Sequence, residues 1–158
     1  DEKGNQISST PLTGKTDQDV DVKGKINVPT NWKIVSGQTI PDTVKATADG
    51  IPTVTVKVQP KMDSITDPAK LNKSISRTIT INKPGEKPQV INQHATFKRT
   101  GQHNEVTGED VYTGWTLKDN SLNHVDVPAV PGYTPSQNTV ASVDNPTANT
   151  KLTDVTIN

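Results

Sequence analysis

The β-branched residues constrain this chain most, because 23 Thr, 17 Val and 11 Ile make up about a third of its 158 residues. Branching at Cβ restricts χ1 in a helix but packs well on a pleated sheet. Leu and Ala together number only 12, and 12 Pro and 10 Gly interrupt the apolar segments. These proportions predict a mostly β protein with little helix, built from short strands and frequent turns.

The core that such a chain can build is small. Leu, Ile, Val and Phe amount to 34 residues, and the absence of cysteine excludes a disulfide framework and thiolate chemistry. The 17 Lys and Arg balance the 17 Asp and Glu, so neither nucleic acid nor an anionic membrane surface is an expected partner. No apolar run approaches the roughly 20 residues that cross a bilayer, which argues against membrane insertion.

Alternation of polar and apolar residues predicts where the strands lie. It runs through residues 19–28, 53–58, 75–81 and 90–100, and further strands are expected near 111–117 and at 155–157. In the second half the alternation places two sets of side chains on one face of a β-meander: Ile75, Arg77, Ile79 and Ile81, then Ile91, Ala95 and Phe97.

The polar segment 63–74 lacks this alternation and is the predicted junction between an N-terminal module, 1–62, and a C-terminal module, 75–158. Within it, Asp67 followed by Pro68 is typical of a helix start, so a turn or two of helix is expected there.

The two modules echo each other in sequence. Val28-Pro29 precedes Trp32 as Val130-Pro131 precedes Tyr133, and each aromatic lies 22 residues before a short Val-Thr-Val or Val-Thr-Ile segment. The echo predicts that each module ends alike, with a turn, an aromatic residue, a connector and a closing strand.

No motif for catalysis or for a cofactor is present, so the chain is not expected to be an enzyme. His94, His103 and His124 have neither the i, i+4 spacing nor the HExxH arrangement of a zinc site, which favours solvated surface histidines. Only four Glu are available for paired acid and base chemistry. The 15 Lys and 13 Asn leave open an intramolecular Lys–Asn amide cross-link, for which the sequence nominates no pair.

Asp17, Asp19 and Asp21 copy the opening of a calcium loop, but Val22 stands where that loop needs glycine. The polar face of a strand is therefore the preferred interpretation, and no metal site is predicted.

The five aromatic residues are so few that most are expected in the core, among them Phe97, Trp32 and Tyr133. Tyr112 and Trp115 are the predicted exceptions. Three positions apart on a strand, they point to opposite faces unless Gly114 marks a bulge, so one of them is expected to project outward as a sugar-stacking or protein-contacting surface.

Several segments resemble a known family. Val28-Pro29-x-x-Trp32-x-Ile34 and Gly37-Gln38-x-Ile40-Pro41 resemble the mucin-binding (MucBP-type) domain of surface adhesins from Gram-positive bacteria. Ala95-Thr96-Phe97-x-Arg99-Thr100, Asn104-Glu105-Val106-Thr107-Gly108 and Val130-Pro131-Gly132-Tyr133-Thr134-Pro135 are similar to the C-terminal module of the Mub-type mucus-binding repeat.

The resemblance implies two small β-grasp (ubiquitin-like) modules in tandem, in an extracellular repeat of a wall-anchored surface protein. It implies non-catalytic binding of host mucin glycoproteins through many weak contacts, in some members also of immunoglobulins, with neighbouring repeats of the same chain as further partners. Two alternatives stay open, an immunoglobulin- or protein-binding module and a passive stalk spacer. Because the family places a strand before Gly4-Asn5, the first sheet is expected to lack its opening strand.

Overall fold

Strands account for nearly all the regular secondary structure of this chain. The computed structural model describes every residue from 1 to 158, with thirteen strands, one α-helix and one 3₁₀ turn. The helix α1 (Pro68–Leu71) is four residues long, and the chain contains no helix with the length and apolar character needed to cross a membrane. The prediction of a mostly β protein with little helix is confirmed.

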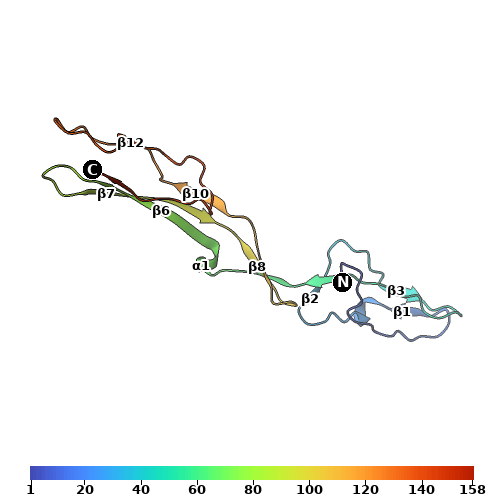
Figure 1. Cartoon of the computed structure of the whole chain (residues 1–158). Helices are drawn as coiled ribbons and strands as arrows, with labels where there is room; N and C mark the ends of the chain where they lie inside the picture. Colours follow the sequence, from blue (N-terminus) through green and yellow to red (C-terminus); the bar gives the residue numbers. More distant parts are fainter. The chain divides into compact units, whose positions relative to one another are not determined.

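Contacts divide the chain into two units, and Figure 1 traces the elements of both. The N-terminal unit comprises Asp1–Asp63 and Gln102–Asp110, and the C-terminal unit comprises Ser64–Gly101 and Val111–Asn158. The modules drawn from the sequence pattern, 1–62 and 75–158 with a junction at 63–74, stay a prediction.

The N-terminal unit contains two pairs of short antiparallel strands. One sheet pairs β1 (Asp19–Asp21) with β3 (Thr43–Lys45), and the other pairs β2 (Trp32–Ile34) with β4 (Val58–Pro60). The buried apolar residues of this unit are Val20, Val22, Ala46 and Val58. All four are small, so the sheets of this unit cover only a thin core.

The predicted strand at 19–28 is correct only at its start. Strand β1 ends at Asp21, and a 3₁₀ turn follows at Lys23–Lys25. The carboxylate of Asp21 accepts a hydrogen bond from the backbone N–H of Gly24 at 3.2 Å. Such a local side-chain acceptor competes with strand pairing, which explains why the alternation continues in sequence after the strand has ended.

The predicted strand at 53–58 is also misplaced, because β4 begins at Val58 and continues through Pro60. Pro60 fits there because β4 belongs to a sheet of only two strands, where a missing N–H costs little. The two modules therefore do not end alike: strand β13 (Val155–Ile157) forms as predicted, but 54–56 is not a strand.

In the C-terminal unit, the longest elements are β6 (Asn72–Ile81) and β7 (Gln89–Lys98), which form one antiparallel hairpin (Figure 1). Strand β10 (Thr116–Asn120) pairs with β7, and β13 pairs in parallel with β6, which gives the order β10-β7-β6-β13. A small pair, β11 (Val125–Asp126) and β12 (Thr139–Val140), completes the unit. Whether the two units are β-grasp modules stays a prediction.

The predicted meander is interrupted after β7. A separate three-stranded sheet has the order β5-β8-β9, formed by β5 (Met62–Ser64), β8 (Gly101–Asn104) and β9 (Asp110–Tyr112). The single strand expected near 111–117 is therefore two strands, β9 and β10, separated by Thr113, Gly114 and Trp115.

The faces predicted for β6 and β7 are confirmed, and they carry the core of the C-terminal unit. One buried cluster consists of Ile79, Ile81, Val140 and Ile157, and a second consists of Ala95, Phe97, Leu122 and Ala148. On the same face, Arg77 and Gln93 stand opposite each other in the hairpin register and are 7% and 6% exposed. Along β6 and β7, the buried pair Arg77 and Gln93 therefore lies between the residues that belong to the first cluster and those that belong to the second.

The guanidinium of Arg77 has no carboxylate partner and binds neutral oxygens instead. Its Nε donates to Oε1 of Gln93 at 2.8 Å, and one terminal nitrogen donates to the carbonyls of Asn123 and Ala141 at 3.2 and 2.9 Å. Gln93 also donates to the Asn123 carbonyl, at 3.0 Å. These bonds connect the hairpin to two irregular segments that cover its face.

The echoed segments form the same turn but place their aromatic residues differently. The N–H of Trp32 donates to the Pro29 carbonyl and that of Tyr133 to the Val130 carbonyl, both at 3.1 Å. In each turn the third residue has a positive φ, 71° at Asn31 and 81° at Gly132, as glycine and asparagine permit. Trp32 continues into β2 and is half-buried, whereas Tyr133 is 63% exposed, so its predicted core role is wrong.

Replacing Arg77 with Met should destabilise the C-terminal unit by about 2–3 kcal/mol, because Gln93 and two carbonyls lose a charged donor in a buried site. Amide hydrogen exchange in β6 and β7 measures this loss. Lys98→Met, which removes a cation from an exposed position of β7, is the matched control. Equal protection in Arg77→Met and in the control would contradict the structural role of Arg77.

Candidate functional site

Tyr112 and Trp115, the two binding residues predicted from the sequence, meet at one arginine. The Cζ atom of Arg99 lies 3.7 Å from the ring centroid of Tyr112 and 4.3 Å from that of Trp115. Both distances are within the roughly 6 Å that define a cation–π contact. We call these three residues the aromatic–arginine stack. The break between β9 and β10 allows both rings to reach the same cation, which a continuous strand would prevent.

The helix α1 fixes the position of Arg99. Nε of Arg99 donates to the carbonyl of Lys70 at 2.8 Å, and its backbone N–H donates to the carbonyl of Leu71 at 3.0 Å. These carbonyls belong to the last turn of the helix, where a cation is favoured. The helix starts as the sequence predicts, because the Asp67 carboxylate accepts the N–H of Ala69 at 3.0 Å.

The ring of Tyr112 packs so closely against the backbone of Gly101 that a side chain at position 101 would overlap it. A Cβ atom placed on Gly101 would lie 2.6 Å from Cδ1 of Tyr112 and 3.0 Å from Cδ1 of Ile65. Two hydrogen bonds hold the neighbouring segments together: the N–H of Thr113 donates to the Thr100 carbonyl at 2.9 Å, and the N–H of Thr100 donates to Oγ1 of Thr113 at 3.0 Å. The Tyr112 ring, on one of these segments, therefore covers Gly101 on the other.

Trp115 is half-buried and packs against the core cluster that contains Phe97 and Leu122. It therefore has a structural role as well as a place in the stack, and Tyr112 is likewise half-buried. The stack offers one cation and the uncovered parts of two aromatic rings. This chemistry suits recognition of a ligand.

Arg99 is the residue of the stack that the sequence reasoning did not select. A signal was available, because Arg99 is one of only two arginines in the chain, beside 15 lysines. A planar guanidinium stacks on aromatic rings and forms several directed hydrogen bonds, which an ammonium group does not do.

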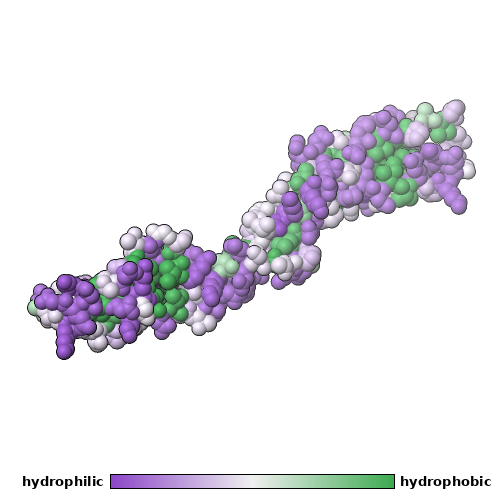
Figure 2. All heavy atoms as spheres, turned by 180° about the vertical axis from the view of Figure 1, so that it is seen from behind, coloured by the Kyte–Doolittle hydropathy of each residue, from purple (hydrophilic) through white to green (hydrophobic).

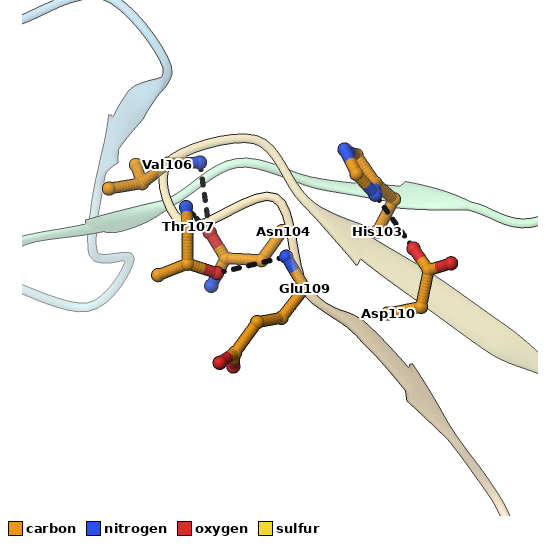
Figure 3. Close-up of polar contacts among 6 residues, drawn as sticks. All are labelled: His103, Asn104, Val106, Thr107, Glu109 and Asp110. Atoms are coloured by element: carbon orange, nitrogen blue, oxygen red, sulfur yellow. Dashed lines mark hydrogen bonds and ion pairs between the residues drawn. The ribbon is translucent and has the colours of Figure 1, made fainter.

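A second polar cluster lies at the turn between β8 and β9 (Figure 3). The side-chain Oδ1 of Asn104 accepts the backbone N–H groups of Val106 and Thr107 at 2.9 and 3.0 Å. Oγ1 of Thr107 accepts the N–H of Glu109 at 3.2 Å, and Gly108 has a φ of 77°. Side chains of the turn thus satisfy its own backbone, as in other turns rich in Asn and Thr.

Next to this turn, Nδ1 of His103 lies 2.7 Å from Oδ1 of Asp110 (Figure 3). The hydrogen bond to Asp110 raises the pKa of His103 above its ordinary value of 6.5, and the charges of Asp110, Glu105 and Asp63 act in the same direction. A hydrogen bond with Asp63 raises the pKa of Glu105, and burial and the charge of Asp63 add to the effect.

The other titratable candidates stay apart. His124 pairs with Asp126 at 2.7 Å, and His94 is exposed. Asp19 and Asp21 lie in β1, and Asp17 has a φ of 65° just before it. No group of three or more His, Asp or Glu side chains is arranged to hold a metal ion.

Comparison with known proteins identifies the family. The Muc B2-like domain family matches residues 66–158, which is more than half of the chain. The chain therefore belongs to the Muc B2-like domain family, and its resemblance to Mub-type repeats is confirmed.

The crystal structure of Mub-RV extends the likeness beyond the matched region. The crystal structure of Mub-RV has a TM-score of 0.60 and 25% identity, covering 98% of this chain and 90% of that chain. The mucin-binding domain of Spr1345 from Streptococcus pneumoniae has a TM-score of 0.46 and 24% identity, covering 61% of this chain and 92% of its own. The type 2 repeat of the mucus binding protein MUB from Lactobacillus reuteri has a TM-score of 0.44 and 16% identity, covering 99% and 93%. No curated protein matches this chain.

Replacing Gly101 with Ala should displace Tyr112 and destabilise the C-terminal unit by about 1–3 kcal/mol, because the added methyl overlaps the ring. Hydrogen exchange reports the stability, and NMR shifts of the Tyr112 and Trp115 rings report the geometry of the stack. Gly114→Ala is the control, since Gly114 has open space at its Cβ position and no positive φ. The interpretation of Gly101 fails if its variant behaves like the control.

Replacing Asp110 with Asn should lower the pKa of His103 toward 6.5, since it removes the carboxylate partner. NMR titration of the imidazole measures this pKa, with Asp126→Asn as the control. Because folding raises the pKa of His103, its stabilising contribution is complete below pH 6.5 and is lost as the pH rises through the raised value. An unchanged titration of His103 in Asp110→Asn would exclude Asp110 as the cause.

Proposed function

We propose that this chain is an adhesion repeat that binds mucin glycoproteins of mucus without catalysis. The observation that carries the proposal is the match of the Muc B2-like domain family to residues 66–158. The likeness of the fold to Mub-RV across 98% of the chain supports the same conclusion for the N-terminal unit. The repeat acts outside the cell, on the surface of a bacterium, where its parent protein is anchored to the wall and carries neighbouring repeats.

The surface supports weak contact by each repeat. Hydrophilic and intermediate residues cover most of the face in Figure 2, and hydrophobic residues gather in a few patches. The large apolar side chains with more than half of their surface exposed are Val90, Val111 and Tyr133. High-affinity interfaces depend on clustered, fully desolvated anchors. A small number of exposed anchors favours attachment through many copies, because tethering raises the effective concentration of each further contact.

Within the repeat, Tyr112 and Trp115 contact the glycan through the parts of their rings that Arg99 leaves uncovered. The guanidinium holds both rings at defined positions, so binding requires little ordering of these side chains. Arg99 also gives the surface a cation beside two apolar faces. An amphipathic surface of this kind matches a sugar, which has apolar C–H faces and hydroxyl groups around its edge.

Adsorption to immobilised mucin tests the function, with one copy of the chain compared with four copies in tandem. We expect the apparent affinity to rise at least about tenfold with four copies. Enzymatic removal of the glycans should abolish the binding. Binding that survives deglycosylation, or that is specific for immunoglobulin, would instead indicate a protein-binding module, and no binding at any copy number would indicate a passive spacer. Either result would contradict the proposal.

A further inference from the structure

The C-terminal unit contains a hollow whose lining residues come from 81–84, 127–135 and 157–158, and none of them belongs to the aromatic–arginine stack. Its volume is about 290 Å³, and its walls are mostly apolar, with Ile81, Val130, Pro135 and Ile157 among the lining residues. Pockets that hold drug-sized ligands measure about 300–1,000 Å³. The hollow is therefore suited to one ring-sized group and too small for a folded element of a partner protein.

Tyr133 lines this hollow and contributes little to the core, since 63% of its surface is exposed. The turn that presents it is fixed by Pro131, by Gly132 with a φ of 81°, and by the hydrogen bond from Tyr133 N–H to the Val130 carbonyl. The same turn in the N-terminal unit delivers Trp32 into a strand pair. The turn thus holds the ring of Tyr133 in a defined position, and the ring takes little part in core packing.

Two asparagine side chains that line the hollow are hydrogen-bonded to each other. Nδ2 of Asn82 donates to Oδ1 of Asn158 at 2.8 Å. That bond leaves Oδ1 of Asn82 as an acceptor and Nδ2 of Asn158 as a donor among the residues that line the hollow. Backbone bonds hold both residues, from Asn82 N–H to the Ile157 carbonyl and from Ser136 N–H to the Asn158 carbonyl, each at 2.8 Å.

Charged side chains are scarce around the hollow. Lys83 is the only charged side chain among the lining residues. A peptide with several charges would find only one charged side chain to pair with in this hollow. An anionic surface would need a patch of several basic side chains, which the lining does not contain. A neutral ligand with both apolar and hydrogen-bonding parts fits it better.

We propose that this hollow is a subsite for one N-acetylhexosamine ring of a glycan. The C–H face of the sugar stacks on Tyr133. The acetamido group supplies an N–H for Oδ1 of Asn82, a carbonyl for Nδ2 of Asn158 and a methyl group for the apolar wall. The proposal rests on the glycan-binding function and names a contact that is separate from Tyr112 and Trp115.

Heteronuclear NMR titration of the 158-residue chain tests the subsite directly, with the methyl glycosides of an N-acetylhexosamine and of a plain hexose as probes. We expect shift changes centred on Tyr133, Asn82 and Asn158, with the N-acetylhexosamine binding at least about fivefold more tightly than the hexose. Tyr133→Ala should weaken binding about fivefold to tenfold through loss of the ring face, and Tyr133→Phe should retain it.

The control is Val106→Ala, which removes an apolar side chain that is 39% exposed and does not line the hollow. Equal binding of the two sugars, the absence of shift changes at Tyr133, Asn82 and Asn158, or wild-type binding by Tyr133→Ala would each overturn the subsite. Mucin adsorption is measured in parallel. Full adsorption by Tyr133→Ala would overturn the subsite and leave the proposed function intact, whereas a wild-type chain that fails to adsorb would contradict the function.

Discussion

The contact on which the C-terminal unit most depends is the set of hydrogen bonds made by the guanidinium of Arg77. No disulfide joins the covering segments to the β6–β7 hairpin. They pack Leu122, Val140 and Ala148 into its two apolar clusters, and the Arg77 bonds add directed contacts to this packing. Arg77 binds the carbonyls of Asn123 and Ala141, one from each covering segment. A buried charge is costly unless its hydrogen bonds are satisfied, and Gln93 together with the carbonyls provides that satisfaction. The irregular segments are thereby placed over the two apolar clusters.

The second arginine repeats this use of backbone carbonyls. Arg99 binds the carbonyl of Lys70 and stacks between two rings. The chain contains 15 lysines, yet the two positions that need several directed donors in one plane both hold arginine. Lysines occupy exposed positions such as Lys98, where only charge and solubility matter. The chain has only 34 strongly apolar residues, so its core is small. The hydrogen bonds of its two guanidinium groups therefore stabilise contacts that apolar packing would stabilise in a protein with a larger core.

The sequence predicts best where a pattern is long and the partner is near in the chain. The faces of β6 and β7 follow from the alternations at 75–81 and 90–100, which the loop at 82–88 joins, and the helix start follows from Asp67 and Pro68. Prediction fails at 19–28, where the Asp21 side chain bonds the backbone and ends the strand. For the candidate site, the prediction selected Tyr112 and Trp115 because aromatic residues are rare in this chain. Arg99 was not selected. Its rarity among 15 lysines was a signal, but its contacts join residues up to 29 positions apart in the chain, which no local period encodes.

The two echoed turns show why an aromatic residue cannot be assigned to the core from its motif alone. Both turns have the same hydrogen bond and the same positive φ, so local sequence fixes the direction in which the chain leaves each turn. The difference arises afterwards: Trp32 begins a strand that pairs with β4, whereas no strand follows Tyr133 until β12. Burial of the ring is thus decided by a partner strand far along the chain. Where that partner is missing, the same local geometry presents an aromatic face to solvent.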